Sequence, residues 1–118
     1  MNISELNKNN VLEILGGSTT VIIPVIDNVV SNSIIGDKQT LGIRIPDHDF
    51  CKRLSQAYPN PITTTSVNRT GQEPMNDPDK IIAKFYDEID LMIDDGIIEG
   101  NASTIYILKN GDLKILRP

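Results

Sequence analysis

Apolar and polar positions follow two different periods along this chain, and the period distinguishes predicted helices from predicted strands. Four apolar side chains recur at helical spacing near the N-terminus: Leu6, Val11, Leu12 and Leu15. Ser4 can cap such a helix, and Gly16-Gly17 can end it. The pattern therefore predicts a first helix from Ser4 to about Leu15.

Two further segments have helical spacing. Asp47 is a suitable N-cap for a helix that runs to about Tyr58, and its predicted inward side chains are Phe50, Cys51 and Leu54. Asp77-Pro78 combines an N-cap with a proline at the first helical position. It predicts a helix to about Glu88 whose buried side chains are Ile81, Ile82 and Phe85.

Six segments have the composition of strands. Their ranges are Thr19–Ile26, with Pro24 as a bend, then Leu41–Ile45, Ile62–Ser66, Leu91–Ile93, and a hairpin of Ser103–Lys109 and Asp112–Leu116 around Asn110-Gly111. Because strands alternate with helices and end in an antiparallel pair, we predict an α/β fold with a mixed, twisted sheet flanked by helices.

The run from Pro61 to Gly71 gathers side chains suited to an anion. If Ile62–Ser66 is a strand, Ser66 and Asn68 lie where its carboxyl end meets a loop, and open α/β sheets bind ligands at that end. Hydroxyl and amide groups beside a tight turn suit a phosphate or a carboxylate. The alternative is a polar-edged strand that ends in an Asx or Ser turn.

Arg44 is the second candidate for ligand binding. In the predicted strand it shares a face with Gly42 and Thr40, while Leu41, Ile43 and Ile45 occupy the other face. A planar guanidinium among apolar neighbours requires a partner, and it fits a carboxylate or a phosphate. A structural salt bridge to one of the sixteen acidic residues explains Arg44 equally well.

Composition narrows the classes of function. The 118 residues suit one domain, and 11 basic against 16 acidic residues give a net charge of −5, which argues against nucleic-acid binding by this chain. No apolar run is long enough to cross a membrane, and no secretory pattern opens the chain, so we expect a cytoplasmic protein. The single cysteine, Cys51, excludes an internal disulfide, and we expect it to be a small buried residue.

The remaining polar residues do not form a recognisable catalytic or metal-binding motif. His48 is the only histidine and is best explained as a residue at a helix start. One acidic run could hold a divalent metal, although a solvated helix end is the more common explanation: Asp87, Glu88, Asp90, Asp94 and Asp95. We therefore assign no catalytic residue and no metal ligand.

Four segments in order resemble a known family. They read TLGIRIPDHDF, NPITTTSVNRTGQEP, DLMIDDGIIEGNASTIYIL and LKILRP. Together they are similar to the YrdC-like domain of threonylcarbamoyl-AMP synthases, over roughly residue 16 to the C-terminus. Four ordered matches are far more specific than one motif. The resemblance implies a YrdC-like fold, present here as a partial domain.

The resemblance also implies an activity. Synthases of this family join threonine, bicarbonate and ATP into threonylcarbamoyl-AMP for tRNA modification and release pyrophosphate, with magnesium as the usual ion. The residues that match the family's threonine site are Arg44, Thr64 and Ser103. Those that match its nucleotide site are Thr40, Ser66, Asn68 and Arg117. In-line attack at phosphorus depends on positioning and charge neutralisation, which such side chains supply.

One family feature has no match in the printed sequence. Complete YrdC-like domains carry a Lys-x-Arg motif whose cations hold the nucleotide phosphates, whereas the first 39 residues here contain only Lys8 and Lys38 as bases. We therefore expect residues 1–118 to be a truncated YrdC-like domain that is inactive alone. We also expect it to associate with itself or with a missing N-terminal half. The alternative is a non-catalytic ligand-binding or oligomerising module of the same fold.

Overall fold

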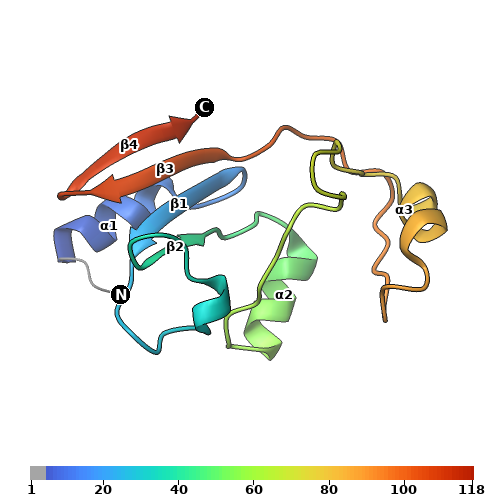
Figure 1. Ribbon diagram of the computed structural model, residues 1–118, viewed down its shortest axis with the longest axis horizontal. Helices are drawn as coiled ribbons and strands as arrows, with labels where there is room; N and C mark the ends of the chain where they lie inside the picture. The colour runs from blue at the N-terminus through green and yellow to red at the C-terminus, as the bar shows by residue number, and fades with distance from the viewer. Residues whose placement is uncertain (1–4) are drawn as a thin grey trace. The chain divides into compact units, whose positions relative to one another are not determined.

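A computed structural model describes residues 5–118 (Figure 1), so the predicted cap Ser4 lies outside the described residues. The elements in chain order are α1 (Glu5–Ile14), β1 (Thr19–Pro24), the short 3-10 helix η1 (Asn32–Ile34), β2 (Thr40–Ile43), α2 (Asp49–Ala57), α3 (Pro78–Phe85), β3 (Thr104–Lys109) and β4 (Asp112–Arg117). They fall into two compact units. The first unit comprises Met1–Ile62 with Ala102–Pro118, and the second is Thr63–Asn101.

The first unit contains a four-stranded sheet in the order β2-β1-β3-β4. The central strand β1 pairs with β2 antiparallel and with β3 parallel, and β3 pairs with β4 antiparallel. Val21 shows the register, since it lies opposite Ile43 on one side and Tyr106 on the other. The predicted mixed α/β fold is thereby confirmed.

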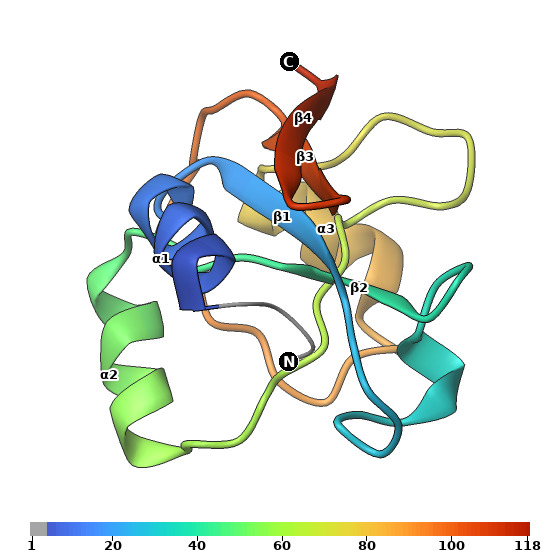
Figure 2. The same cartoon turned by 90° about the vertical axis from the view of Figure 1, so that its left-hand side faces the viewer.

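The core lies between one face of this sheet and α1, which lies against the sheet in Figure 2. Its buried side chains are Val11 from α1, Val21, Ile23 and Val25 from β1 and the residues after it, and Leu108 from β3. The odd-numbered residues of β1 share this face because strand side chains alternate. The apolar alternation of β1 thus determines which face of the sheet is buried.

The C-terminal hairpin matches its prediction closely. Lys109 lies opposite Asp112, and the two residues between them have positive φ angles, 52° for Asn110 and 82° for Gly111. An Asn-Gly pair adopts these angles readily, and the resulting turn matches the twist of the flanking strands. The register shifts between Ile105 and Tyr106, where β4 has one extra residue.

The helix at 49–57 begins later than predicted and packs less deeply. Its N-cap is His48 rather than Asp47, because the Asp47 carboxylate binds Lys52 instead. Phe50 and Leu54 were predicted to face inward, but they are 40% and 38% exposed. Cys51 is only half-buried, so its assignment as a buried residue is also wrong.

The third helix has the predicted start and an earlier end. Asp77 caps α3 by accepting a hydrogen bond from the Asp79 amide at 3.0 Å, and Pro78 occupies the first turn. The helix ends at Phe85, and turns continue to residue 88. No side chain of α3 is fully buried, which corrects the prediction that its apolar face is.

Two predicted strands, at Ile62–Ser66 and Leu91–Ile93, are absent. Both segments are extended or irregular and largely exposed, and Leu91 is 77% exposed. A strand is stable only beside a partner that satisfies its backbone groups, and the β-branched composition of these segments does not supply one. The strands at 19–24 and 40–43 are also shorter than predicted, because the sheet pairing stops at Pro24 and Ile43.

Candidate functional site

Arg44 lies at one end of the sheet, where β2 and β4 finish and β1 and β3 begin. The ladder between β1 and β2 stops at Ile43, so Arg44 lies just beyond the strand rather than inside it as predicted. Its Nη2 donates a hydrogen bond of 3.3 Å to the carbonyl oxygen of Gly17. Gly17 precedes β1, so this contact joins the end of β2 to the start of β1.

Arg117 occupies the same end of the sheet. Its Nε and Nη2 both donate to the carbonyl oxygen of Ser103, at 3.3 and 2.9 Å. The next amide, that of Thr104, donates to the Ser18 carbonyl at 3.0 Å, and Ser18 follows the residue that Arg44 contacts. Two guanidinium groups are therefore anchored on neighbouring backbone segments, with Ser103 beside them.

The guanidinium of Arg44 retains most of its binding capacity. A guanidinium has five N–H donors, and within the described part of the first unit Arg44 uses one nitrogen, Nη2, for the contact with Gly17. Within the described part of its own unit, no carboxylate lies at ion-pairing distance from Arg44. That unit therefore does not supply the structural salt bridge considered as an alternative, and the group is available to an external anion.

A hollow of about 160 Å³ adjoins Arg44. The residues that line it are Arg44, Ile45, Pro46, Cys51, Lys52 and Ser55. Sequence reasoning did not identify Lys52 and Ser55. The sequence could have indicated them, because Cys51 and Ser55 are four residues apart in the predicted helix and therefore share a face next to Lys52.

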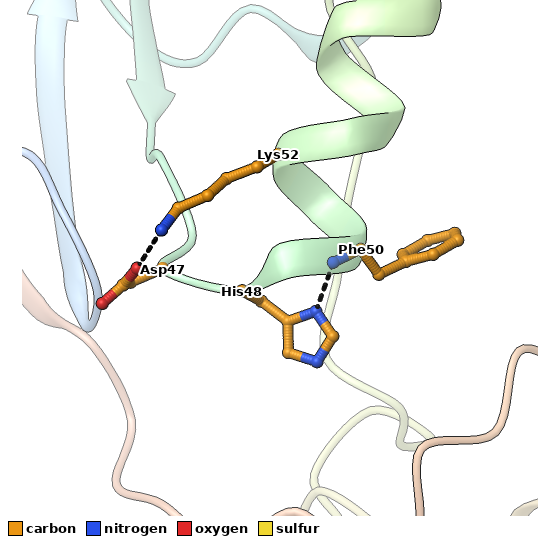
Figure 3. A network of polar contacts seen from close by, with 4 residues as sticks. All are labelled: Asp47, His48, Phe50 and Lys52. Atoms are coloured by element: carbon orange, nitrogen blue, oxygen red, sulfur yellow. Dashed lines mark hydrogen bonds and ion pairs between the residues drawn. The ribbon is translucent and has the colours of Figure 1, made fainter.

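Lys52, which lines this hollow, forms an ion pair at the start of α2, next to the helix cap (Figure 3). Lys52 Nζ lies 2.6 Å from an Asp47 carboxylate oxygen. The hydrogen bond and charge of Lys52 lower the pKa of Asp47, and those of Asp47 raise the pKa of Lys52. His48 Nδ1 accepts a hydrogen bond of 3.1 Å from the Phe50 amide, which confirms the histidine as a helix-start residue.

Thr40 lies away from this group of residues. It begins β2 and is opposite Pro24, at the other end of the ladder from Ile43. Its hydroxyl donates to the Asp37 carbonyl at 2.8 Å, and its carbonyl accepts the Gly36 amide at 2.8 Å. At about 3.3 Å per residue, the four-residue strand separates Thr40 from Arg44 by about 13 Å.

The other predicted site residues belong to the second unit. Thr64 and Ser66 are exposed in an irregular segment, so the prediction that Ser66 lies at the carboxyl end of a strand is wrong. The Ser66 hydroxyl donates to Asn68 Oδ1, while Asn68 Nδ2 donates to the Arg69 carbonyl at 2.9 Å. The Ser–Asx contact proposed as the alternative is therefore present, without the strand. A site shared by Arg44 and these residues stays a prediction.

Residues 5–118 lack both a cluster of metal-ligating side chains and a membrane-spanning helix. No three His, Cys, Asp or Glu side chains in this part of the chain gather closely enough to hold a metal ion. None of the helices that the structure describes is long and apolar enough to span a membrane.

The sequence is similar to that of curated threonylcarbamoyl-AMP synthases. The chain is 29% identical over 93 residues to a threonylcarbamoyl-AMP synthase from Idiomarina loihiensis, covering 79% of this chain and 50% of that protein. The corresponding enzyme from Chromohalobacter salexigens is 29% identical over 110 residues, covering 91% and 57%. The chain thus spans about half the length of these curated relatives.

Solved structures give the same result for the fold. E. coli YciO superposes with a TM-score of 0.84 at 22% identity, covering 98% of this chain and 57% of that one. P. abyssi Sua5 complexed with L-threonine superposes with a TM-score of 0.83 at 27% identity, covering 100% and 35%. The sequence model of the Sua5/YciO/YrdC family, described as "Telomere recombination", matches residues 2–118. The chain belongs to the Sua5/YciO/YrdC family.

Proposed function

We propose that this chain provides the threonine-binding part of a threonylcarbamoyl-AMP synthase. The observation that carries the proposal is the Arg44 guanidinium, which is anchored at the end of the sheet and has no carboxylate partner among the described residues of its own unit. A planar cation of this kind binds a carboxylate through two parallel hydrogen bonds. The synthase relatives and the threonine complex of P. abyssi Sua5 support threonine as the source of that carboxylate.

The remaining assignments extend this proposal. Ser103 lies beside the anchored Arg117, and its hydroxyl together with that of Thr64 would bind threonine. Arg117 would neutralise charge on the nucleotide. The other proposed nucleotide-binding residues are Thr40, Ser66 and Asn68. For Thr64, Ser66 and Asn68 the support is the family motif and the ordered loop that holds the last two.

The proposed chemistry relies on positioning. Threonine and bicarbonate supply the carbamate whose oxygen attacks the α-phosphorus of ATP, and pyrophosphate leaves from the opposite side. Charge at the phosphoryl oxygens is offset by arginine and by the Mg²⁺ that accompanies ATP. No side chain in the described residues needs to act as a general acid or base in this scheme.

We further propose that residues 1–118 alone do not sustain turnover. Triphosphate binding requires several cations, and Arg117 is the only arginine assigned to the nucleotide, because Arg44 is assigned to threonine. Removing cations from a phosphoryl-transfer site lowers rates by orders of magnitude, since their attraction is strongest in the transition state. A Lys-x-Arg segment of the kind the family carries would supply further positive charge.

The test is ATP-dependent pyrophosphate release with L-threonine and bicarbonate, using the 118-residue chain with and without a supplied Lys-x-Arg segment. We expect no threonine-dependent release from the chain alone and measurable release from the mixture. Robust turnover by the chain alone would refute the requirement for further cations. A mixture that binds threonine but never releases pyrophosphate would favour a non-catalytic binding module.

We also propose that the chain associates through apolar surface. Along α2, Phe50, Leu54 and the following Tyr58 are spaced four residues apart and are all exposed. Such a stripe is more stable against another protein surface than in water. Sedimentation equilibrium on the wild type and on an F50S/L54S variant tests this, and a strictly monomeric wild type would contradict it.

A further inference from the structure

Arg69 lies in the middle of the loop that carries Ser66 and Asn68, yet its side chain points to α3. The guanidinium forms an ion pair with Glu88, three residues after the end of α3. Its central carbon also lies 4.9 Å from the centroid of the Phe85 ring. A guanidinium over an aromatic face gains cation–π attraction in addition to the salt bridge. Arg69 is therefore engaged in two directions within its own unit.

A second contact joins the same loop to the same ring. Lys84 Nζ lies 5.7 Å from the centroid of Phe85 and donates a hydrogen bond of 2.7 Å to Gln72 Oε1. Gln72 is three residues after Arg69, and its amide donates to the Arg69 carbonyl at 3.0 Å. The end of α3 therefore holds the loop at two points, Arg69 through the Phe85 ring and Gln72 through Lys84.

Hydrogen bonds connect Arg69 to Ser66 and Asn68, the predicted ligand-binding residues of this loop. Its carbonyl oxygen accepts the side-chain amide of Asn68 at 2.9 Å, which fixes the orientation of that side chain. Asn68 Oδ1 then accepts the hydroxyl of Ser66. The base of the loop is closed by the Met75 amide, which donates to the Val67 carbonyl at 2.8 Å. An unbroken series of contacts thus runs from Phe85 and Glu88 to Ser66.

We propose that Arg69 is a positioning residue, held by Phe85 and Glu88, that orders the Ser66–Asn68 turn for nucleotide binding. This inference rests on the proposed function for the role of Ser66 and Asn68. Arg69 itself does not contact the nucleotide, because its guanidinium is committed to Glu88 and Phe85. An exposed ion pair contributes little alone, and the ring contact and the backbone hydrogen bonds make the arrangement cooperative.

The first readout does not depend on any ligand. In the 118-residue chain, hydrogen exchange of the Met75 amide should be about five- to tenfold faster in R69A, the sum of a modest ion pair and a cation–π contact. Lys80 provides a matched control, because it lies on α3 and forms an exposed pair with Asp77 at 3.7 Å. K80A should leave the Met75 rate within about twofold of wild type. Unchanged exchange in R69A overturns the proposal.

A charge exchange separates specific pairing from general damage. E88R alone should accelerate Met75 exchange as R69A does, and the double variant R69E/E88R should recover part of the wild-type rate. No recovery would show that the Arg69–Glu88 pair is not what orders the turn. R69K should be intermediate, because lysine keeps the charge and loses the planar stacking surface.

The second readout connects the turn to the nucleotide. ATP titrated into the wild type, R69A and K80A should bind about five- to tenfold more weakly to R69A only, while L-threonine affinity is the same in all three. If the wild type binds no ATP, the nucleotide role proposed for Ser66 and Asn68 fails, and the exchange data still decide the positioning role. Faster exchange with unchanged ATP affinity would overturn the link to binding.

Discussion

Shortening Ile23 should destabilise the first unit more than any change at its surface. Ile23 is 1% exposed and lies in the core between β1 and α1. Ile23→Ala removes roughly three methyl or methylene groups at about 0.8 kcal/mol each, or about 2.4 kcal/mol of transfer free energy. A residual cavity increases this, but half-buried neighbours such as Leu41 and Ile43 can move inward, so we expect about 2.5–3.5 kcal/mol in total.

Urea unfolding followed by far-UV circular dichroism measures the loss. Ile23→Val, which removes one methyl group, should lower the free energy of unfolding by about 1 kcal/mol. Ile115 is 60% exposed on β4 and provides the control, so Ile115→Ala should lower it by less than about 1 kcal/mol. A loss below about 1 kcal/mol for Ile23→Ala, or equal losses at both positions, would refute this description of the core.

Three smaller predictions concern individual contacts. His48→Ala should lower the unfolding free energy by about 1 kcal/mol in thermal melts because it removes the N-cap of α2, and His48→Asn should restore most of that loss. Gly111→Ala should lower it by about 1 kcal/mol in the same melts, since φ is 82° there, while the new methyl group would meet Asn7 Nδ2 at an ordinary contact distance of 3.7 Å. Because Lys52 lowers the pKa of Asp47, this carboxylate stabilises the fold at pH values above its ordinary pKa of 3.8, and the stabilisation is lost as the pH falls through the lowered pKa. Asp47→Asn should therefore flatten the acid limb of the urea midpoint against pH, an effect that salt reduces; identical limbs would contradict it.

The sequence predicted a strand correctly where the local pattern of residues is matched by a partner strand in the folded sheet. The Asn110-Gly111 turn and its flanking strands were found because the turn chemistry and the alternation are both local. Ile62–Ser66 has equally strong β-branched composition and is not a strand. The difference is the availability of a partner strand, which depends on tertiary structure and is not visible in a short sequence window.

At the start of α2, two adjacent residues could each cap the helix. Asp47 and His48 can both cap a helix, and the better intrinsic cap is aspartate. Lys52, one turn further on, captures the Asp47 carboxylate, so the histidine makes the cap instead. A choice between two adjacent caps depends on a side chain whose position only the folded structure defines.

For the candidate site, residue type and strand context selected Arg44, and the resemblance to the family added Ser103 and Arg117. The structure adds that both arginines are anchored on backbone carbonyls at one end of the sheet and that Thr40 lies at the other. Backbone carbonyl partners are invisible in a sequence, because every residue carries one. This explains why the candidates could be chosen while their anchoring could not.

The central claim is that Arg44 binds the carboxylate of threonine, and isothermal titration calorimetry tests it most directly. L-Threonine should bind the 118-residue chain, and Arg44→Ala should weaken binding about 10- to 100-fold, as expected for the loss of charged hydrogen bonds. Arg44→Lys should recover only part of the affinity, because it cannot form the bidentate pair. Threoninamide, which lacks the carboxylate, should bind wild type and Arg44→Ala equally weakly. Equal threonine affinity in wild type and Arg44→Ala would contradict the account.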